Sequence, residues 1–188
     1  MLGAAAGAVG TVALDVSTYF DMAIRGRPSS QVPTRTVERL AITAGVPLAR
    51  GGPSASAEEQ QHYEQQLENR ASGLGALMGY GVGVGVGAAY GALRPWLGSA
   101  PVPLTALALG CAAMAGGDLP SILTGTTNPK QWGTSGWLAD IVPHLAYGLF
   151  TALAFEAISG GVLGRREVSR AEYIAAAARH AAMRGGLR

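Results

Sequence analysis

The sequence predicts an all-α membrane protein, a bundle of about four transmembrane helices with a polar helical loop and a short basic C-terminal helix. Three observations predict this class. Charged residues make up only 14% of the 188 residues, against about a quarter in typical soluble domains. Uncharged runs approach the roughly twenty residues that a helix needs to cross the hydrocarbon layer. Basic residues cluster outside these runs, where lipid head groups would lie.

The central feature is a charge-free, glycine-rich stretch at 73–91, which lies between Arg70 and Arg94. Val82, Val84 and Val86 alternate with glycine, as in a strand, but a strand of this length with glycine along one face would be exceptional. We therefore predict a span over 72–93. On a helix, glycines at every fourth position form one shallow face against which another helix backbone can pack closely. These helix-packing glycines are Gly75, Gly79, Gly83, Gly87 and Gly91.

The same stretch contains a weak match to a phosphate-binding loop. Gly83, Gly85 and Ala88 fit the pattern G-x-G-x-x-A. The pattern requires a preceding strand and an acidic residue about twenty positions later. Here the polar residues 68–72 precede it and the next acidic residue is Asp118, so we do not predict a nucleotide site.

A first span is predicted over residues 2–24. It is not a typical signal peptide, because a basic start is missing and Asp15, Ser17 and Thr18 interrupt its apolar part. Asp15 lies near the middle of the span. A carboxylate there costs roughly 2.5–3.5 kcal/mol on insertion scales, so we expect it to face the bundle interior and to have a partner or a proton.

The segment 25–71 is polar and is predicted to lie outside the membrane. Residues 33–44 are compatible with a short helix with one apolar stripe. Ser56 followed by Glu59 is a capping box that predicts a polar helix running into the glycine span without a break. This polar helix would be a solvated stalk or, alternatively, a docking surface for a partner.

The third span is predicted over 102–124. It contains Gly116, Gly117, Asp118 and Pro120, so we predict a kinked helix. Broken helices at membrane depth line protein or a cavity, which makes Asp118 a candidate functional residue.

The fourth span is predicted over 138–163, where Asp140, His144, Tyr147 and Thr151 share one helix face. In the simpler interpretation Asp140 caps the helix start and His144 forms a structural hydrogen bond. In the alternative, Asp140 and His144 form a protonatable relay, since a histidine beside a carboxylate titrates near physiological pH. Glu156, on another face, also needs a partner or a proton.

A short internal repeat relates the two predicted hairpins. Asp15 and Tyr80 in the first correspond to Asp118 and Tyr147 in the second. If the hairpins pack as a pseudo-symmetric pair, Asp15 and Asp118 occupy related positions. The candidate polar site within the membrane consists of Asp15, Asp118, Asp140, His144, Tyr80 and Tyr147.

The tail 165–188 is predicted to form a short basic helix whose arginines, among them Arg165, Arg166, Arg170 and Arg179, suit an anionic lipid surface. The first loop carries a similar number of arginines, so the positive-inside rule does not decide the orientation.

Several function classes lack their sequence signals. Cys111 is the single cysteine, so an intrachain disulfide and a C-x-x-C metal motif are absent. The patterns H-E-x-x-H and G-x-S-x-G are also absent. The net charge is only +2, and the basic residues do not indicate nucleic-acid binding. We therefore predict no catalytic residues, no metal, no cofactor and no nucleic-acid partner.

Two stretches carry a resemblance to a known group of proteins. Residues 21–28 (Asp-Met-Ala-Ile-Arg-Gly-Arg-Pro) and 137–148 (Trp-Leu-Ala-Asp-Ile-Val-Pro-His-Leu-Ala-Tyr-Gly) resemble small uncharacterised actinobacterial integral-membrane proteins and, more remotely, YagU-like membrane proteins. The resemblance implies a multi-pass protein of the bacterial inner (plasma) membrane and carries over no functional residue.

Two functions follow as hypotheses. The first is a non-catalytic membrane subunit or assembly factor with a membrane-protein partner or a second copy, because glycine-faced helices favour close partners. The second is a small proton-linked transporter or channel that uses the intramembrane Asp and His residues.

Overall fold

A computed structural model describes the backbone of residues 1–49, 56–97 and 100–185 and the side chains through Gly160. Within these residues it contains five α-helices, one 3₁₀ turn and no strand. The helices are α1 (Leu2–Arg25), α2 (Val32–Ala44), α3 (Ala57–Leu97), α4 (Val102–Leu123) and α5 (Gly133–Gly185), and the turn η1 (Pro129–Gln131) precedes α5. The predicted all-α class is confirmed.

Three of the described helices are long and apolar enough to cross a membrane. They are α3, α4 and the Gly133–Gly160 part of α5. The first predicted span forms α1, which carries Asp15 and Asp21 and is not among the three. Four transmembrane helices therefore remain a prediction.

The polar helix before the glycine run begins and continues as predicted. The Ser56 hydroxyl accepts a hydrogen bond from the Glu59 amide at 3.3 Å and donates to the Glu59 carboxylate at 3.0 Å. The Ser56 hydroxyl thus satisfies the Glu59 amide, one of the groups that a helix start leaves without partners. From there α3 runs unbroken for 41 residues and ends two residues after Pro95.

The start of α5 differs from the prediction. The helix begins at Gly133, which adopts a φ of 64° that glycine accepts at little cost, and not near residue 138. Asp140 therefore lies in the second turn and Pro143 in the third, and Asp140 is not the helix cap. Packing beside Trp132 and α1 outweighs the poor helix propensity of residues 133–136.

The C-terminal tail does not form a separate helix. In the structure α5 continues without interruption to Gly185, so the predicted tail helix is the C-terminal part of α5. The arginine side chains of this tail lie outside the described residues.

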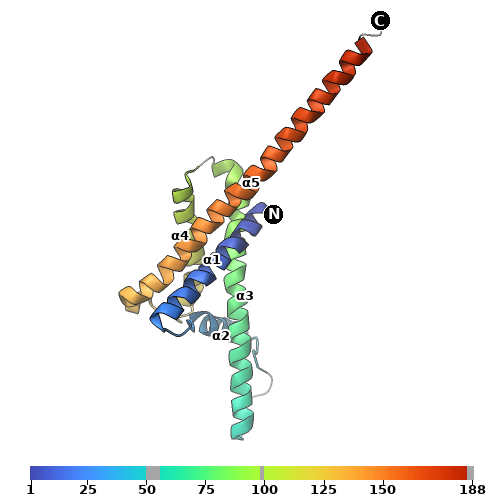
Figure 1. The fold of residues 1–188 in the computed structure, drawn as a ribbon. Helices are drawn as coiled ribbons and strands as arrows, with labels where there is room; N and C mark the ends of the chain where they lie inside the picture. Colours follow the sequence, from blue (N-terminus) through green and yellow to red (C-terminus); the bar gives the residue numbers. More distant parts are fainter. Residues whose placement is uncertain (50–55, 98–99, 186–188) are drawn as a thin grey trace.

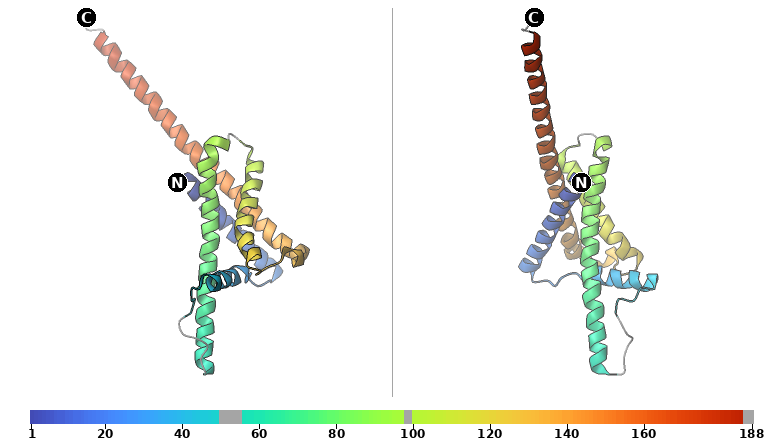
Figure 2. Two further views of the ribbon diagram at one scale, coloured as in Figure 1. Left: turned by 180° about the vertical axis from the view of Figure 1, so that it is seen from behind. Right: turned by 90° about the vertical axis from the view of Figure 1, so that its right-hand side faces the viewer.

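The membrane-length helices and α1 form the bundle (Figure 1). Helix α1 packs against α3 and α5, while α4 packs against α5 and less extensively against α3. Helix α2 lies across one end of the bundle (Figures 1 and 2). The N-terminal half of α3 and the C-terminal half of α5 extend beyond the bundle in opposite directions.

The core is small, and large apolar side chains face outward. Tyr147 is fully buried and packs in a cluster with Phe155, Leu109 and small residues such as Ala6 and Ala113. Many other large apolar side chains are exposed, among them Val12, Val16, Phe20, Leu77, Leu104, Leu107, Leu138 and Phe150. Exposed apolar surface of this extent is typical of helices that contact lipid or a partner.

Candidate functional site

Helix α1 packs against about half the length of the glycine face of α3. A Cβ atom at Gly87 would lie 2.5 Å from the Gly7 Cα, and one at Gly91 would lie 2.7 Å from the Gly3 Cα. These contacts are backbone to backbone, so only glycine allows the two helices to approach this closely. The glycine face is thus occupied by a helix of the same chain at Gly83, Gly87 and Gly91.

The other two glycines of this face have different surroundings. A Cβ atom at Gly75 would lie 3.0 Å from the Pro33 carbonyl carbon at the start of α2. At Gly79 an added Cβ would meet nothing within 4 Å, and this residue is exposed. The five glycines therefore do not act as one continuous interface.

Tyr147 connects neighbouring helices at the centre of the bundle. It is fully buried, and its hydroxyl donates a hydrogen bond to the Gly83 carbonyl oxygen at 2.6 Å, which links α5 to α3. One turn further along α5, the buried Thr151 lies where a side chain at Gly10 of α1 would be placed. The Tyr147 ring also lies against α1, since a Cβ at Gly10 would be 2.9 Å from its Cδ2 atom, so Tyr147 contacts both α1 and α3.

Asp118, Asp140 and His144 converge between α4 and α5. The His144 Nδ1 atom lies 2.8 Å from the Asp140 backbone oxygen and 3.3 Å from its carboxylate Oδ1. A carbonyl oxygen only accepts, so the first contact requires the proton on Nδ1. Asp118 of α4 is close enough to interact electrostatically with both residues.

These three side chains are only partly shielded. His144 keeps 16% and Asp140 20% of its side-chain surface exposed, and Asp118 is half-buried. Two carboxyl groups and an imidazole in this arrangement can hold and exchange protons, because the charge of each group affects the protonation of its neighbours. The sequence placed Asp140 and His144 on one face, and the structure adds Asp118 to them.

Asp15 and Tyr80 form a separate pair on the outside of the bundle. The Tyr80 hydroxyl donates to the Asp15 carboxylate at 2.9 Å, and 47% of the Tyr80 surface is exposed. The expectation that Asp15 has a partner is met, but the partner is not in the interior. The repeat does not extend to these contacts, since Tyr80 binds Asp15 whereas Tyr147 binds the backbone of Gly83.

One charge pair was missed by sequence reasoning. Arg94 binds Glu156 at 2.9 Å and joins the last turn of α3 to α5, at the other end of this span from Gly75, where α2 packs. The sequence indicated that Glu156 needs a partner, but Arg94 was considered only as the charged residue that follows the glycine-rich stretch. Their separation of 62 positions gives no local signal.

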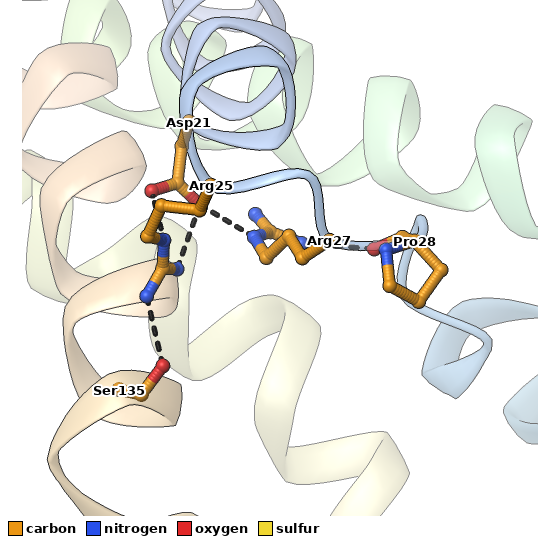
Figure 3. A network of polar contacts seen from close by, with 5 residues as sticks. All are labelled: Asp21, Arg25, Arg27, Pro28 and Ser135. Atoms are coloured by element: carbon orange, nitrogen blue, oxygen red, sulfur yellow. Dashed lines mark hydrogen bonds and ion pairs between the residues drawn. The ribbon is translucent and has the colours of Figure 1, made fainter.

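A second missed network joins α1 to α5 at the other end of the bundle. Arg25 and Arg27 both bind the Asp21 carboxylate, and Arg25 also donates to the Ser135 hydroxyl at 2.8 Å (Figure 3). The spacing of Asp21 and Arg25 by four residues is a signal for the first contact. The contact with Ser135 depends on the packing of α5.

The part of the chain that the structure describes contains no group of three or more His, Cys, Asp or Glu residues placed to hold a metal ion. Comparison with protein-family models, with curated proteins and with solved structures found no match. The resemblance to actinobacterial membrane proteins therefore stays a prediction, and the function must be inferred from the residues themselves.

Proposed function

We propose that this chain is a non-catalytic, multi-pass membrane subunit or accessory factor of a bacterial inner membrane. The observation that carries the proposal is the Asp15–Tyr80 pair, in which a half-buried carboxylate meets an exposed phenol on the outside of two apolar helices. A membrane-protein partner or a second copy of the chain would cover this pair.

The length of α3 supports a placement in the bilayer. Gly75, where α2 packs, and Trp96, which is 79% exposed, are 21 residues apart. This corresponds to about 30 Å of helix, close to the thickness of a hydrocarbon layer. The Trp132–Trp137 pair lies at the end where α5 begins, and tryptophans concentrate at membrane interfaces. In this placement α1 is a fourth span.

The Asp15–Tyr80 pair then lies inside the hydrocarbon layer. A carboxylate facing lipid is unfavourable by roughly 2.5–3.5 kcal/mol on insertion scales. Tyr80 supplies one hydrogen bond, and a donor from a partner helix would supply another. The Gly83–Gly91 part of the glycine face is not available for this purpose, because α1 fills it.

Purification of the full chain from its native membrane in mild detergent tests this proposal. Mass and co-purifying chains should show a stoichiometric membrane protein or a second copy, and Asp15→Ala should release it. Leu107→Ala is the matched control, because it also truncates an exposed side chain on the outside of the bundle, on α4. A wild-type chain that is monomeric and has no co-purifying protein would refute the proposal.

A second function, a small proton-linked transporter or channel, is favoured by the convergence of Asp118, Asp140 and His144. Asp118→Asn and His144→Ala should abolish pH-dependent flux into liposomes. Asp15→Asn should leave the flux intact, since Asp15 contacts Tyr80 on another part of the bundle. Unchanged flux in the His144 variant would remove this cluster from any transport mechanism.

A further inference from the structure

Helix α2 is held firmly across one end of the bundle. Its first turn contacts α3 where Pro33 lies against Gly75. Its second turn contacts α4, where the fully buried Thr36 hydroxyl donates to the Ser121 hydroxyl at 2.9 Å. These two anchors fix the level of α2 relative to the membrane-length helices.

That level coincides with the ends of the neighbouring helices. Helix α4 ends at Leu123, α5 begins at Gly133, and the tilted Trp132–Trp137 pair, with ring centroids 5.0 Å apart, lies beside this connection. Both views in Figure 2 show α2 lying across α3 at this end. A helix in this position, with one buried face and an exposed Ile42, is typical of a helix that lies in the interfacial layer.

The side of α2 turned away from the bundle carries two arginines. Arg35 and Arg39 are one helical turn apart and both are exposed. Among the residues that the structure describes, neither guanidinium group has a hydrogen-bond or ion-pair partner. Nearby arginines differ in this respect, since Arg25 and Arg27 bind Asp21.

We propose that Arg35 and Arg39 bind the head group of an anionic phospholipid, with the exposed Ile42 beside its acyl chain. Adjacent guanidinium groups match phosphate oxygens in charge and geometry. Glu38 is the only acidic residue of α2, so the helix keeps a net positive charge toward the lipid. This inference rests on the bilayer placement proposed above, but not on the role as a subunit.

Native mass spectrometry of the detergent-purified full chain tests the proposal, with phosphatidylglycerol or phosphatidylcholine added in increasing amounts. The wild type should retain phosphatidylglycerol preferentially. Interfacial arginines contribute about 1 kcal/mol each, so Arg35→Gln and Arg39→Gln should each weaken this binding about fivefold. A double Lys variant, Arg35→Lys with Arg39→Lys, keeps the charge but loses the planar guanidinium geometry, so it should bind phosphatidylglycerol more weakly than the wild type but more strongly than the double Gln variant.

Lys130→Gln is the control for general electrostatic attraction, because Lys130 is exposed at the same end of the bundle. The proposal is overturned if the variant that combines Arg35→Gln with Arg39→Gln binds phosphatidylglycerol like the wild type, or if Lys130→Gln loses as much binding as that double variant. A separate result tests the placement: a chain released from membranes by buffer without detergent would overturn the membrane position itself. A membrane-bound chain without lipid preference would overturn only the lipid site.

Discussion

Substitution of Gly87 by alanine tests the packing of α1 on α3 most directly. The added Cβ would lie 2.5 Å from the Gly7 Cα and 2.7 Å from the Gly7 nitrogen. All these neighbours are backbone atoms, so no side-chain rotation relieves the contact, and the two helices must separate by about 1 Å to restore normal contact distances. Overpacking of this kind costs about 1–3 kcal/mol of unfolding free energy.

Gly85→Ala is the matched control on the same helix. Nothing lies within 4 Å of a Cβ at this position. Both substitutions change helix propensity by the same amount, up to about 1 kcal/mol in favour of alanine. The difference in stability between the two variants therefore isolates the clash.

Equilibrium unfolding of the detergent-solubilised chain with increasing mole fraction of sodium dodecyl sulfate measures this difference. Gly87→Ala should unfold at a lower mole fraction than Gly85→Ala, by an amount equivalent to about 1–3 kcal/mol. If the two variants unfold together, α1 does not pack on the glycine face of α3, and the derived arrangement of these helices is wrong.

Three further predictions concern single contacts. Tyr147→Phe removes the hydrogen bond to Gly83 and should lower the unfolding free energy by about 0.5–1.5 kcal/mol in the same assay; an unchanged value would mean that the bond adds no net stability. Arg94→Glu should destabilise by about 1 kcal/mol or less, because the pair with Glu156 is partly exposed, and adding Glu156→Arg should restore the loss. Cys111 is exposed on the surface of α4, which faces lipid in the proposed bilayer placement. A charged maleimide should therefore not label Cys111 in intact membranes but should label it after denaturation in detergent. Labelling in intact membranes would contradict the bilayer placement.

Local signals in the sequence were sufficient for most helices. The capping box at Ser56 and Glu59 marked the start of α3, and residues 33–44 of α2 were predicted to within one residue. Helix α5 begins at Gly133, five residues before the predicted fourth span, and this early start has no sequence signal because Gly133 and Gly136 are poor helix formers. Their helical conformation depends on packing beside Trp132 and on the Arg25–Ser135 contact.

The candidate polar site was predicted only in part. Asp140 and His144 were assigned to one face because their spacing of four residues places them there on any helix. The approach of Asp118 to this pair, and the separation of Asp15 from it, could not be predicted, because both depend on how α1 and α4 cross their neighbours. The same holds for Arg94 and Glu156, which lie 62 positions apart.

The helical class and the apolar character of the chain can be predicted from the sequence, because composition and periodicity are local properties that each helix carries alone. The glycine face of α3 is a local property of the same kind. What fills that face depends on how the helices pack. Helices that cross at an angle are close over a few turns, so α1 meets Gly83, Gly87 and Gly91 while α2 meets Gly75, and Gly79 is left open.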